Sequence, residues 1–407
     1  MVGTSRYVPI VGAVVLGAGL LLVGPAAAQV PPVLRVGVAS AACPAPTHPT
    51  LVAAVAAAAP GSTILVCPGV YPGTVVVDKP LILRGAQRGV DARAGRSNVA
   101  AESVIDGGGA AGIRITGTTS GVTVDGFTIR NAGTSTQNAD GIEAFSGGSG
   151  FTFTDNVVTQ TTYGITMSST GAVASTVAHN RFDTNNRSGA AGGSGVFVCC
   201  GPGNNLTIAD NLFTGHSSAA VNTAGDAARP STGLRIERNQ SIDDATFAVV
   251  VNAKAAVVAD NVVVRRPGAV VDAGSGIYVG GGTTSLQVTR NVISAGAATG
   301  IRVTNVYGAP NVGLAVVGNQ VIDRQYGVRL SGQTSGTVRD NSIARSTTVG
   351  ILLDADNAGV TVTGNRIGQD PLDCQDRSTG TRTAGTANTW TGNVALRSLP
   401  VGVCGRF

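Results

Sequence analysis

The sequence of 407 residues is poor in lysine, histidine, methionine and aromatic residues. Lysine occurs only at Lys79 and Lys254, so arginine carries nearly all of the positive charge, and the arginines are dispersed along the chain. Dispersed arginines do not favour nucleic-acid binding. With 3 histidines and 2 methionines, the chain also offers few soft ligands for a metal. Glycine is abundant instead, at 58 residues, which suits a coil of narrow turns better than a packed helical domain.

The one long apolar run lies at the N-terminus. It covers residues 8–23, follows Arg6 and leads to a small-residue cleavage site at Ala28 before Gln29. This pattern predicts a signal peptide over residues 1–28, because the run is short for a helix that spans a membrane. We therefore expect a secreted, extracellular protein with no membrane segment after cleavage, whose residues 29–42 form a linker.

The most regular feature is an asparagine that follows an apolar residue by three positions and precedes another by two. Its copies are about 27 residues apart, which is typical of a one-dimensional repeat architecture. The clear copies are Asn156, Asn180, Asn211, Asn261, Asn291, Asn341 and Asn365, the looser ones are Asn239, Asn319 and Asn393, and Phe127 holds the same place in an earlier copy. Stacked carboxamides can bond to one another and to the turn backbone, so we expect an asparagine ladder.

A second motif, Gly-Ile-x-Val, recurs between the asparagines. It begins at Gly112, Gly141, Gly164, Gly195, Gly276, Gly300, Gly327 and Gly350. Apolar residues two apart, bounded by Gly, Asn, Asp and Ser, are typical of short strands with one buried face. Each coil is then expected to hold three short strands, which pair in parallel with their equivalents one coil away at about 4.8 Å.

Together the two motifs resemble the right-handed parallel β-helix repeat of the pectin-lyase-like superfamily, in its NosD-like and generic β-helix-repeat branch. The resemblance runs from residue 43 to 396 and implies an all-β, single-domain right-handed parallel β-helix. Members of the superfamily include polysaccharide lyases, glycosidases, epimerases, esterases and proteins with no known activity, so the resemblance is specific for the fold alone. A NosD-like role in metal insertion is less favoured, because methionine and histidine are scarce.

The cysteines mark the two ends of this coil. Cys43 and Cys67 flank an alanine-rich segment that reads as a short capping helix, begun by Thr50 and ended by Pro60. Cys374 and Cys404 bracket the last segment, so residues 397–407 are expected to form a tail tied by a disulfide. Cysteines of an exported protein are mostly oxidised, which predicts the pairs 43–67 and 374–404.

Cys199 and Cys200 are adjacent and lie outside this scheme. An adjacent disulfide, two free thiols and a soft-metal site are all compatible with the pair, and the adjacent disulfide is favoured over the metal site because His216 is too distant in sequence.

The outer face of the Gly-Ile-x-Val strands is the expected functional surface. The Ile and Val should point inward, so x and the residue before Gly should point outward. The outward positions are Arg114, Asp140, Glu143, Tyr163, Thr166, Ser194, Phe197, Phe247, Val250, Ser275, Tyr278, Thr299, Arg302, Tyr326, Arg329, Val349 and Leu352. In the superfamily this face is where substrates usually lie.

Two catalytic hypotheses follow from these positions. A lyase would use Arg302 and Arg329 to remove the proton beside a uronate carboxyl, with Tyr278 or Tyr326 as the acid. A hydrolase would need two carboxylates, for which Asp140 and Glu143 are the outward pair. Tyr163, Phe197 and Tyr326 are the candidates for stacking on sugars.

The partner expected for this face is a polysaccharide. The net charge of +5 favours an acidic one, whose carboxylates arginine recognises with two parallel hydrogen bonds. The alternative is a non-catalytic glycan-binding or partner-binding protein of the cell envelope, because no complete catalytic signature occurs. No cofactor motif is evident, calcium is unsupported by any motif, and a monomer is expected. Arg302 and Arg329 are expected one coil apart, with no acidic residue at either adjacent outward position in these coils.

Overall fold

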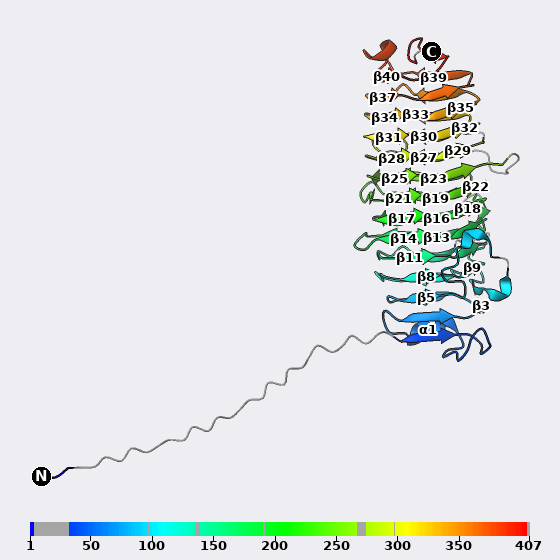
Figure 1. Cartoon of the computed structure of the whole chain (residues 1–407), viewed down its shortest axis with the longest axis vertical. Helices are drawn as coiled ribbons and strands as arrows, with labels where there is room; N and C mark the ends of the chain where they lie inside the picture. The colour runs from blue at the N-terminus through cyan, green and yellow to red at the C-terminus, as the bar shows by residue number, and fades with distance from the viewer. Residues whose placement is uncertain are drawn as a thin grey trace.

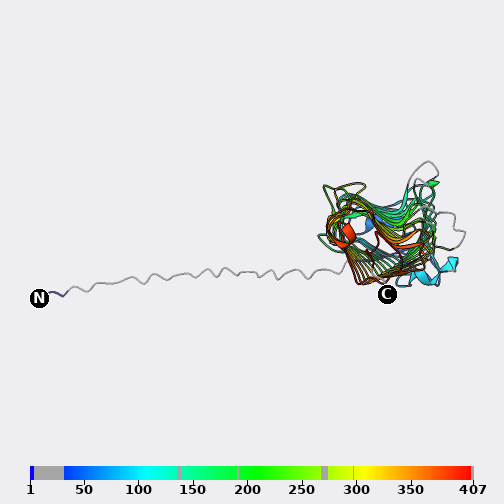
Figure 2. The ribbon, with the colours of Figure 1, turned by 90° about the horizontal axis from the view of Figure 1, so that it is seen from above.

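The chain forms one column of stacked coils. The computed structural model describes residues 1–3, 32–96, 98–134, 139–189, 192–266, 274–296 and 298–404, so nearly all of the predicted signal peptide lies outside the described residues. From β1 onward the strands follow one another up the column to its other end (Figure 1). A view along the axis shows the coils superimposed around a common interior (Figure 2). This is the parallel β-helix that the two repeated motifs predict.

Sheet I contains 14 strands among the described residues. In pairing order they are β1 (Val33–Val36), β2 (Thr63–Val66), β5 (Ile82–Arg84), β8 (Thr123–Asp125), β11 (Thr152–Thr154), β14 (Ser175–Ala178), β17 (Leu206–Ala209), β21 (Arg235–Glu237), β25 (Val257–Ala259), β28 (Gln287–Thr289), β31 (Leu314–Val317), β34 (Gly336–Arg339), β37 (Val360–Thr363) and β40 (Thr389–Thr391).

Sheet II holds the Gly-Ile-x-Val motifs and has 13 strands in the described part of the chain. In pairing order they are β4 (Val75–Val77), β7 (Ile113–Ile115), β10 (Asp140–Ala144), β13 (Tyr163–Ser169), β16 (Ser194–Gly203), β19 (Ala219–Ala224), β23 (Thr246–Val251), β27 (Ile277–Val279), β30 (Ile301–Val303), β33 (Tyr326–Leu330), β36 (Val349–Leu353), β39 (Leu372–Asp376) and β41 (Ser398–Leu399).

Sheet III follows the asparagine turn and has 12 strands within the described ranges. In pairing order they are β3 (Gly69–Pro72), β6 (Ser103–Asp106), β9 (Thr128–Arg130), β12 (Val157–Thr159), β15 (Arg181–Asp183), β18 (Leu212–Thr214), β22 (Gln240–Ile242), β26 (Val262–Val264), β29 (Val292–Ser294), β32 (Gln320–Ile322), β35 (Ser342–Ala344) and β38 (Arg366–Gly368). A short parallel pair, β20 (Ser231–Thr232) and β24 (Ala253–Lys254), adds a side ribbon.

Alternation of side chains builds the core from very short strands. In β7 the side chains of Ile113 and Ile115 are buried and that of Arg114 is exposed. The inward side chains of successive coils fill the interior with stacked apolar groups, such as Phe182 and Phe213, whose ring centroids are 5.0 Å apart. Burying each Ile or Phe contributes about 1.5–3 kcal/mol, so the column gains stability coil by coil.

The asparagine ladder is present, as predicted. It runs unbroken through Asn156, Asn180, Asn211, Asn239, Asn261, Asn291, Asn319, Asn341, Asn365 and Asn393. The carboxamide oxygen of Asn261 accepts from the backbone nitrogen and Nδ2 of Asn239, while its own Nδ2 donates to the carbonyl oxygen of Ile236 and to Oδ1 of Asn291. All ten side chains are buried at the turn between sheets I and III.

The residue before many ladder asparagines has left-handed backbone geometry. Asp155, His179, Asp210, Arg238, Asp260, Arg290 and Asp340 have φ between 52° and 58°. Residues other than glycine are uncommon in this backbone region. Both arginines of the set form an ion pair with an aspartate of the preceding coil. Arg238 pairs with Asp210 at 2.8 Å and Arg290 with Asp260 at 2.7 Å.

The N-terminal end is closed by a helix and a disulfide. Helix α1 (Leu51–Ala57) is capped by Thr50, whose hydroxyl oxygen accepts from the Ala53 nitrogen at 3.2 Å, and its buried side chains cover the first coil. The helix ends at Ala57, ahead of the predicted stop at Pro60. The predicted disulfide between Cys43 and Cys67 is present.

The C-terminal end carries the second disulfide. Cys374 and Cys404 are bonded, as predicted. Two strands extend the column past the boundaries drawn from the sequence: β1 lies in the segment assigned to a linker and pairs with β2, and β41 lies in the assigned tail and pairs with β39. Three short 3-10 turns complete the described structure: Ala92–Ala94, Val99–Ala101 and Thr383–Gly385. Among the described residues, no helix is long and apolar enough to cross a membrane.

The outward assignment of Phe247 and Val250 is wrong. Both side chains are buried, at 1% and 0% exposure. Ala248 of β23 pairs with Val221 and with Ile277, so Val249 takes the outward position. This coil lacks the Gly-Ile pair that sets the frame of the motif in its neighbours.

Near the C-terminal end, the strand register confirms two predicted outward positions that are nevertheless buried. Leu352 and Val349 stand in register with Arg329 and Tyr326, yet both are buried. A position on the outer face of the sheet is therefore not always accessible.

Candidate functional site

The outer face of sheet II places side chains from successive coils in register. Its central column consists of Arg114, Glu143, Thr166, Phe197, Asn222, Val249, Tyr278, Arg302, Arg329, Leu352 and Gln375. A parallel column begins with Asp140, Tyr163 and Ser194. Every sequence-predicted site residue lies in one of these two columns or beside them, and the strands of sheet II run through the middle of Figure 1.

The predicted residues fall into two groups. We call Arg114, Asp140, Glu143, Tyr163 and Phe197 the carboxylate cluster, and Tyr278, Arg302, Tyr326, Arg329 and Asp354 the arginine cluster. Six coil steps separate Glu143 in β10 from Arg302 in β30, which is about 29 Å at the usual strand spacing. The two clusters therefore cannot act on one sugar residue together.

Within the carboxylate cluster, the two acids have different surroundings. Arg114 Nε donates to Glu143 Oε2 at 2.5 Å, so Glu143 has a fixed cationic partner. Asp140 forms no salt bridge among the described residues and is only 6% exposed. Burial raises the pKa of Asp140 to about 7, and the charge of Glu143 adds to the rise, while contacts with Thr166 and Arg114 oppose it.

An aromatic pair borders the two carboxyl groups. Tyr163 lies one coil above Asp140, and its ring centroid is 5.0 Å from that of Phe197 in the next coil. Both rings are half-buried. Burial raises the pKa of the Tyr163 hydroxyl, and the neighbouring Asp140 adds to that rise.

Two buried hydroxyls lie beside the aromatic pair. Ser194 follows Tyr163 in its column, and Thr162 precedes Tyr163 in sequence. Within the described part of the chain, neither hydroxyl has a hydrogen-bond partner. Both residues are 0% exposed, so the two unpartnered hydroxyls cost stability in this coil.

The arginine cluster is more open. Arg302 is exposed and lies over the ring of Tyr278, 5.8 Å from its centroid, and Arg329 lies over Tyr326 at 5.3 Å. Arg302 and Arg329 are direct partners in the register of β30 and β33, as expected. Cation–π contacts of this kind hold the guanidinium groups along the face.

Arg329 has an acidic partner that lies outside the adjacent outward positions of the motif. Its Nε donates to Asp354 Oδ2 at 2.8 Å, and Arg377 also reaches Asp354. Asp354 directly follows β36, a position that the strand motif does not mark. Across the described residues, Arg302 has no ion pair and is the one of the two whose charge is uncompensated.

Cys199 and Cys200 lie beside the carboxylate cluster. They are free thiols whose Sγ atoms are 2.7 Å apart, so the favoured adjacent disulfide is absent from the structure. The described side chains include no group of three or more His, Cys, Asp or Glu positioned to hold a metal ion.

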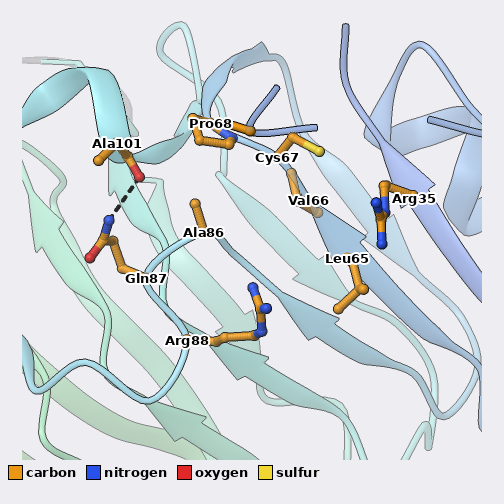
Figure 3. Close-up of a pocket in the computed structure, with 10 residues that line it drawn as sticks. Arg35, Leu65, Val66, Cys67, Pro68, Ala86, Gln87, Arg88 and Ala101 are labelled. Carbon is orange, nitrogen blue, oxygen red and sulfur yellow. Dashed lines mark hydrogen bonds between the residues drawn. The ribbon is translucent and has the colours of Figure 1, made fainter. Parts of the chain in front are cut away.

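Surface hollows lie elsewhere. One of about 350 Å³, near the N-terminal end, is bordered by Arg35, Leu65, Gln87 and Arg88. Figure 3 shows Arg35 and Arg88 on either side of Leu65, and the Gln87 side chain bonded to the carbonyl of Ala101 at 2.8 Å. None of the predicted site residues lines this hollow.

Sequence reasoning missed three contributors. Arg114 was placed on the face but given no role, although it pairs with Glu143 one coil away. Asp354 was overlooked because it lies just past a strand end. The bulge that carries Cys199 was also missed, although an Asn-, Gly- and Pro-containing run after the two cysteines signals a break in the strand.

Comparison with known proteins places the chain in a family. The model described as "Right handed beta helix region" matches residues 77–240, 111–293 and 231–394, which together cover most of the chain. The protein belongs to this family of right-handed parallel β-helix proteins. No curated protein matches it in sequence.

Solved structures share the fold at low identity. The A-module of the mannuronan C-5 epimerase AlgE6 of Azotobacter vinelandii has a TM-score of 0.57 at 16% identity, over 85% of this chain and 93% of that one. The catalytic unit of a GH87 alpha-1,3-glucanase from Streptomyces thermodiastaticus has a TM-score of 0.58 at 14% identity, over 84% and 64%. The Dettilon tailspike protein has a TM-score of 0.52 at 17% identity, over 83% and 61%. At these identities the similarity concerns the fold alone.

Proposed function

We propose that this protein is exported and acts on an acidic polysaccharide laid along the outer face of sheet II. The observation that carries the proposal is the carboxylate cluster: two adjacent carboxyl groups in contrasting environments, beside an aromatic pair. Glycoside hydrolysis needs one protonated and one ionised carboxyl group, and different surroundings can give two carboxyl groups different pKa values. Two disulfides fit an oxidising compartment, and similar structures include enzymes named for mannuronan and alpha-1,3-glucan.

The roles in this proposal follow from the geometry. Asp140, whose pKa is about 7, donates a proton to the leaving oxygen as the general acid. Glu143 is the second carboxylate, positioned by Arg114. Tyr163 and Phe197 stack on neighbouring sugars.

The arginine cluster supports acidic specificity. Arg302 is exposed and without an acidic partner among the described residues, and Tyr278 holds it on the face. A sugar carboxylate would supply the missing anion. A lyase that uses Arg302 or Arg329 as its base is less well supported, because Asp354 compensates the charge of Arg329 and a guanidinium gives up its proton only with difficulty.

The second candidate is a non-catalytic glycan-binding protein. Its support is the burial of both carboxyl groups, at 6% and 8% exposure, which limits the access of a scissile bond to Asp140 and Glu143. In that case the aromatic pair and Arg302 alone would form the binding surface.

The test is incubation of the purified protein with a panel of acidic and neutral polysaccharides, followed for new reducing ends and for ultraviolet absorbance. We expect reducing ends without unsaturated products, and a loss of at least about 100-fold in Asp140→Asn and Glu143→Gln. Glycan affinity should persist in both variants. Unsaturated products would indicate a lyase, and binding without any product would establish the second candidate.

A further inference from the structure

The adjacent thiols Cys199 and Cys200 lie in a bulge of sheet II. Thr166 and Met167 of β13 pair with Phe197 and Val198 of β16, but the next pair is Ser169 with Gly203. Ser168 alone therefore stands opposite residues 199–202. Bulges re-aim side chains and concentrate next to functional sites.

The bulge brings both sulfur atoms together. Successive residues of a regular strand point to opposite faces, so two adjacent cysteines would normally be kept apart. Cys200 has a φ of 65°, in the left-handed region, which breaks the alternation and leaves the Sγ atoms 2.7 Å apart. The same geometry occurs at the turns before the ladder asparagines, but here it falls inside β16 and turns both cysteine side chains toward each other.

The pair differs from the other cysteines in exposure. Cys43, Cys67, Cys374 and Cys404 are buried and bonded at the ends of the column. Cys200 is exposed and can meet an oxidant, while Cys199 behind it is buried. A protein that holds two disulfides matures under oxidising conditions, where a thiol pair in contact can also be oxidised.

We propose that Cys199 and Cys200 form a reversible dithiol–disulfide pair. Its oxidation changes the conformation of β16, the strand that carries Phe197 of the carboxylate cluster. The oxidant is a small or protein disulfide. The Cys200 thiolate attacks one sulfur of that disulfide and expels its first thiolate, which takes up a proton. Cys199, whose thiol pKa is raised by burial, loses its proton as its Sγ attacks Sγ of Cys200, and the second thiolate that is expelled takes up that proton. Two protein thiols and one partner disulfide become one protein disulfide and two partner thiols.

Reversibility follows from the covalent geometry of neighbouring residues. Consecutive Cα atoms lie about 3.8 Å apart across a trans peptide, whereas disulfides usually join Cα atoms at least about 4.4 Å apart. The resulting ring is strained and therefore more readily reduced than the buried pairs. Exposed, strained disulfides are the ones that serve as labile or regulatory bonds.

Oxidation of the pair affects the carboxylate cluster because the two lie side by side. Phe197 of the aromatic pair is two residues from Cys199 on the same strand. Burial raises the pKa of the Cys199 thiol, and the charge of Asp140 adds to the rise. Closing a ring at the bulge changes the backbone that carries Phe197. The redox step itself does not depend on the glycan function, whereas any effect on glycan affinity rests on it.

The test equilibrates the full-length protein in glutathione buffers from reducing to oxidising, then alkylates the free thiols and maps peptides by mass spectrometry. We expect two adducts on the 199–200 peptide under reducing conditions, and under oxidising conditions no adduct and a mass lower by two hydrogens. The other two disulfides should remain intact throughout. Two alkylated thiols at every potential, or only a glutathione adduct on Cys200, would overturn the proposal.

A second readout measures the conformation of the strands that carry the carboxylate cluster, without any glycan. Hydrogen exchange should differ between the oxidised and reduced protein in peptides from β10, β13 and β16, and not in those from β36 to β40. The Cys199→Ser/Cys200→Ser double variant, taken through the same buffers, should show no difference. Identical exchange in both states of the native protein would contradict a change in the conformation of β16, even if glycan binding fails for other reasons.

Discussion

At the scale of single residues, the environment of a carboxyl group decides its use. Asp140 and Glu143 are three positions apart on β10, but only Glu143 has an arginine partner at hydrogen-bond distance. The sequence was sufficient to place both on one face, because the Gly-Ile-x-Val motif fixes which positions point outward. It could not show that both are buried, since burial depends on neighbouring coils and the segments that cover them.

Asp140 should make the stability of the protein depend on pH. Its pKa is about 7 in the folded state against an ordinary value of 3.8, so between these pH values the native state keeps a proton that the unfolded chain releases. The free energy of unfolding should therefore fall as pH rises through this window, by about 3 kcal/mol from this group.

The measurement is urea unfolding at pH 4.5 and pH 8. Asp140→Asn should flatten the difference between the two, because its side chain does not titrate. Asp78→Asn, which changes an exposed carboxylate, should retain the native difference. If the Asp140 variant loses as much stability between the two pH values as the native protein, its carboxyl is not protonated near neutrality.

At the scale of the element, the turn and the strand are the units that the sequence specifies. Ten asparagines and eight glycines set the turns and strands of sheets I, II and III, and both patterns are found in place. The coil of β23 shows the limit of such reasoning. Without the Gly-Ile pair, the apolar run from Phe247 to Val251 has no internal mark of which side chain faces outward, and only pairing with Val221 and Ile277 decides it.

The ladder should be a large source of turn stability. Replacing Asn261 by Ala would leave the Asn239 amide, the Ile236 carbonyl and the Asn291 carboxamide without their partner. Buried polar groups without partners are costly, so we expect a loss of about 2–4 kcal/mol in the free energy of unfolding. Denaturant unfolding with the exposed Asn305→Ala as the control measures it. Equal effects of the two substitutions would show that the ladder is not stabilising.

At the scale of the whole molecule, the column sets distances along its axis. Register alone fixes that Arg302 and Arg329 are neighbours and that both are far from Asp140. The sequence predicted the first relation and assigned the arginines and the carboxylates to two alternative reactions, but it did not give the distance between the two groups, because that distance depends on how many coils are stacked between them.

Arg302 should control affinity for acidic glycans without affecting the fold. Its side chain is exposed and has no ion pair among the described residues, so Arg302→Ala should leave the free energy of unfolding within about 0.5 kcal/mol. Affinity for an acidic oligosaccharide should fall by about tenfold and lose part of its salt dependence. Arg366→Ala removes the same charge from an exposed position on sheet III and should change neither quantity. Unfolding of the Arg302 variant, or equal losses in both, would refute this role.

The most direct test of the account is the dependence of affinity on the length of an acidic oligosaccharide. A glycan along sheet II places about one sugar on each coil, so a chain that joins Asp140 to Arg302 needs about seven units. Calorimetry over oligomers of increasing length should show a step in affinity near that length, and the step should vanish in Arg302→Ala. Affinity that is already maximal for a trimer, or that rises smoothly and equally in both proteins, would contradict a glycan bound along this face.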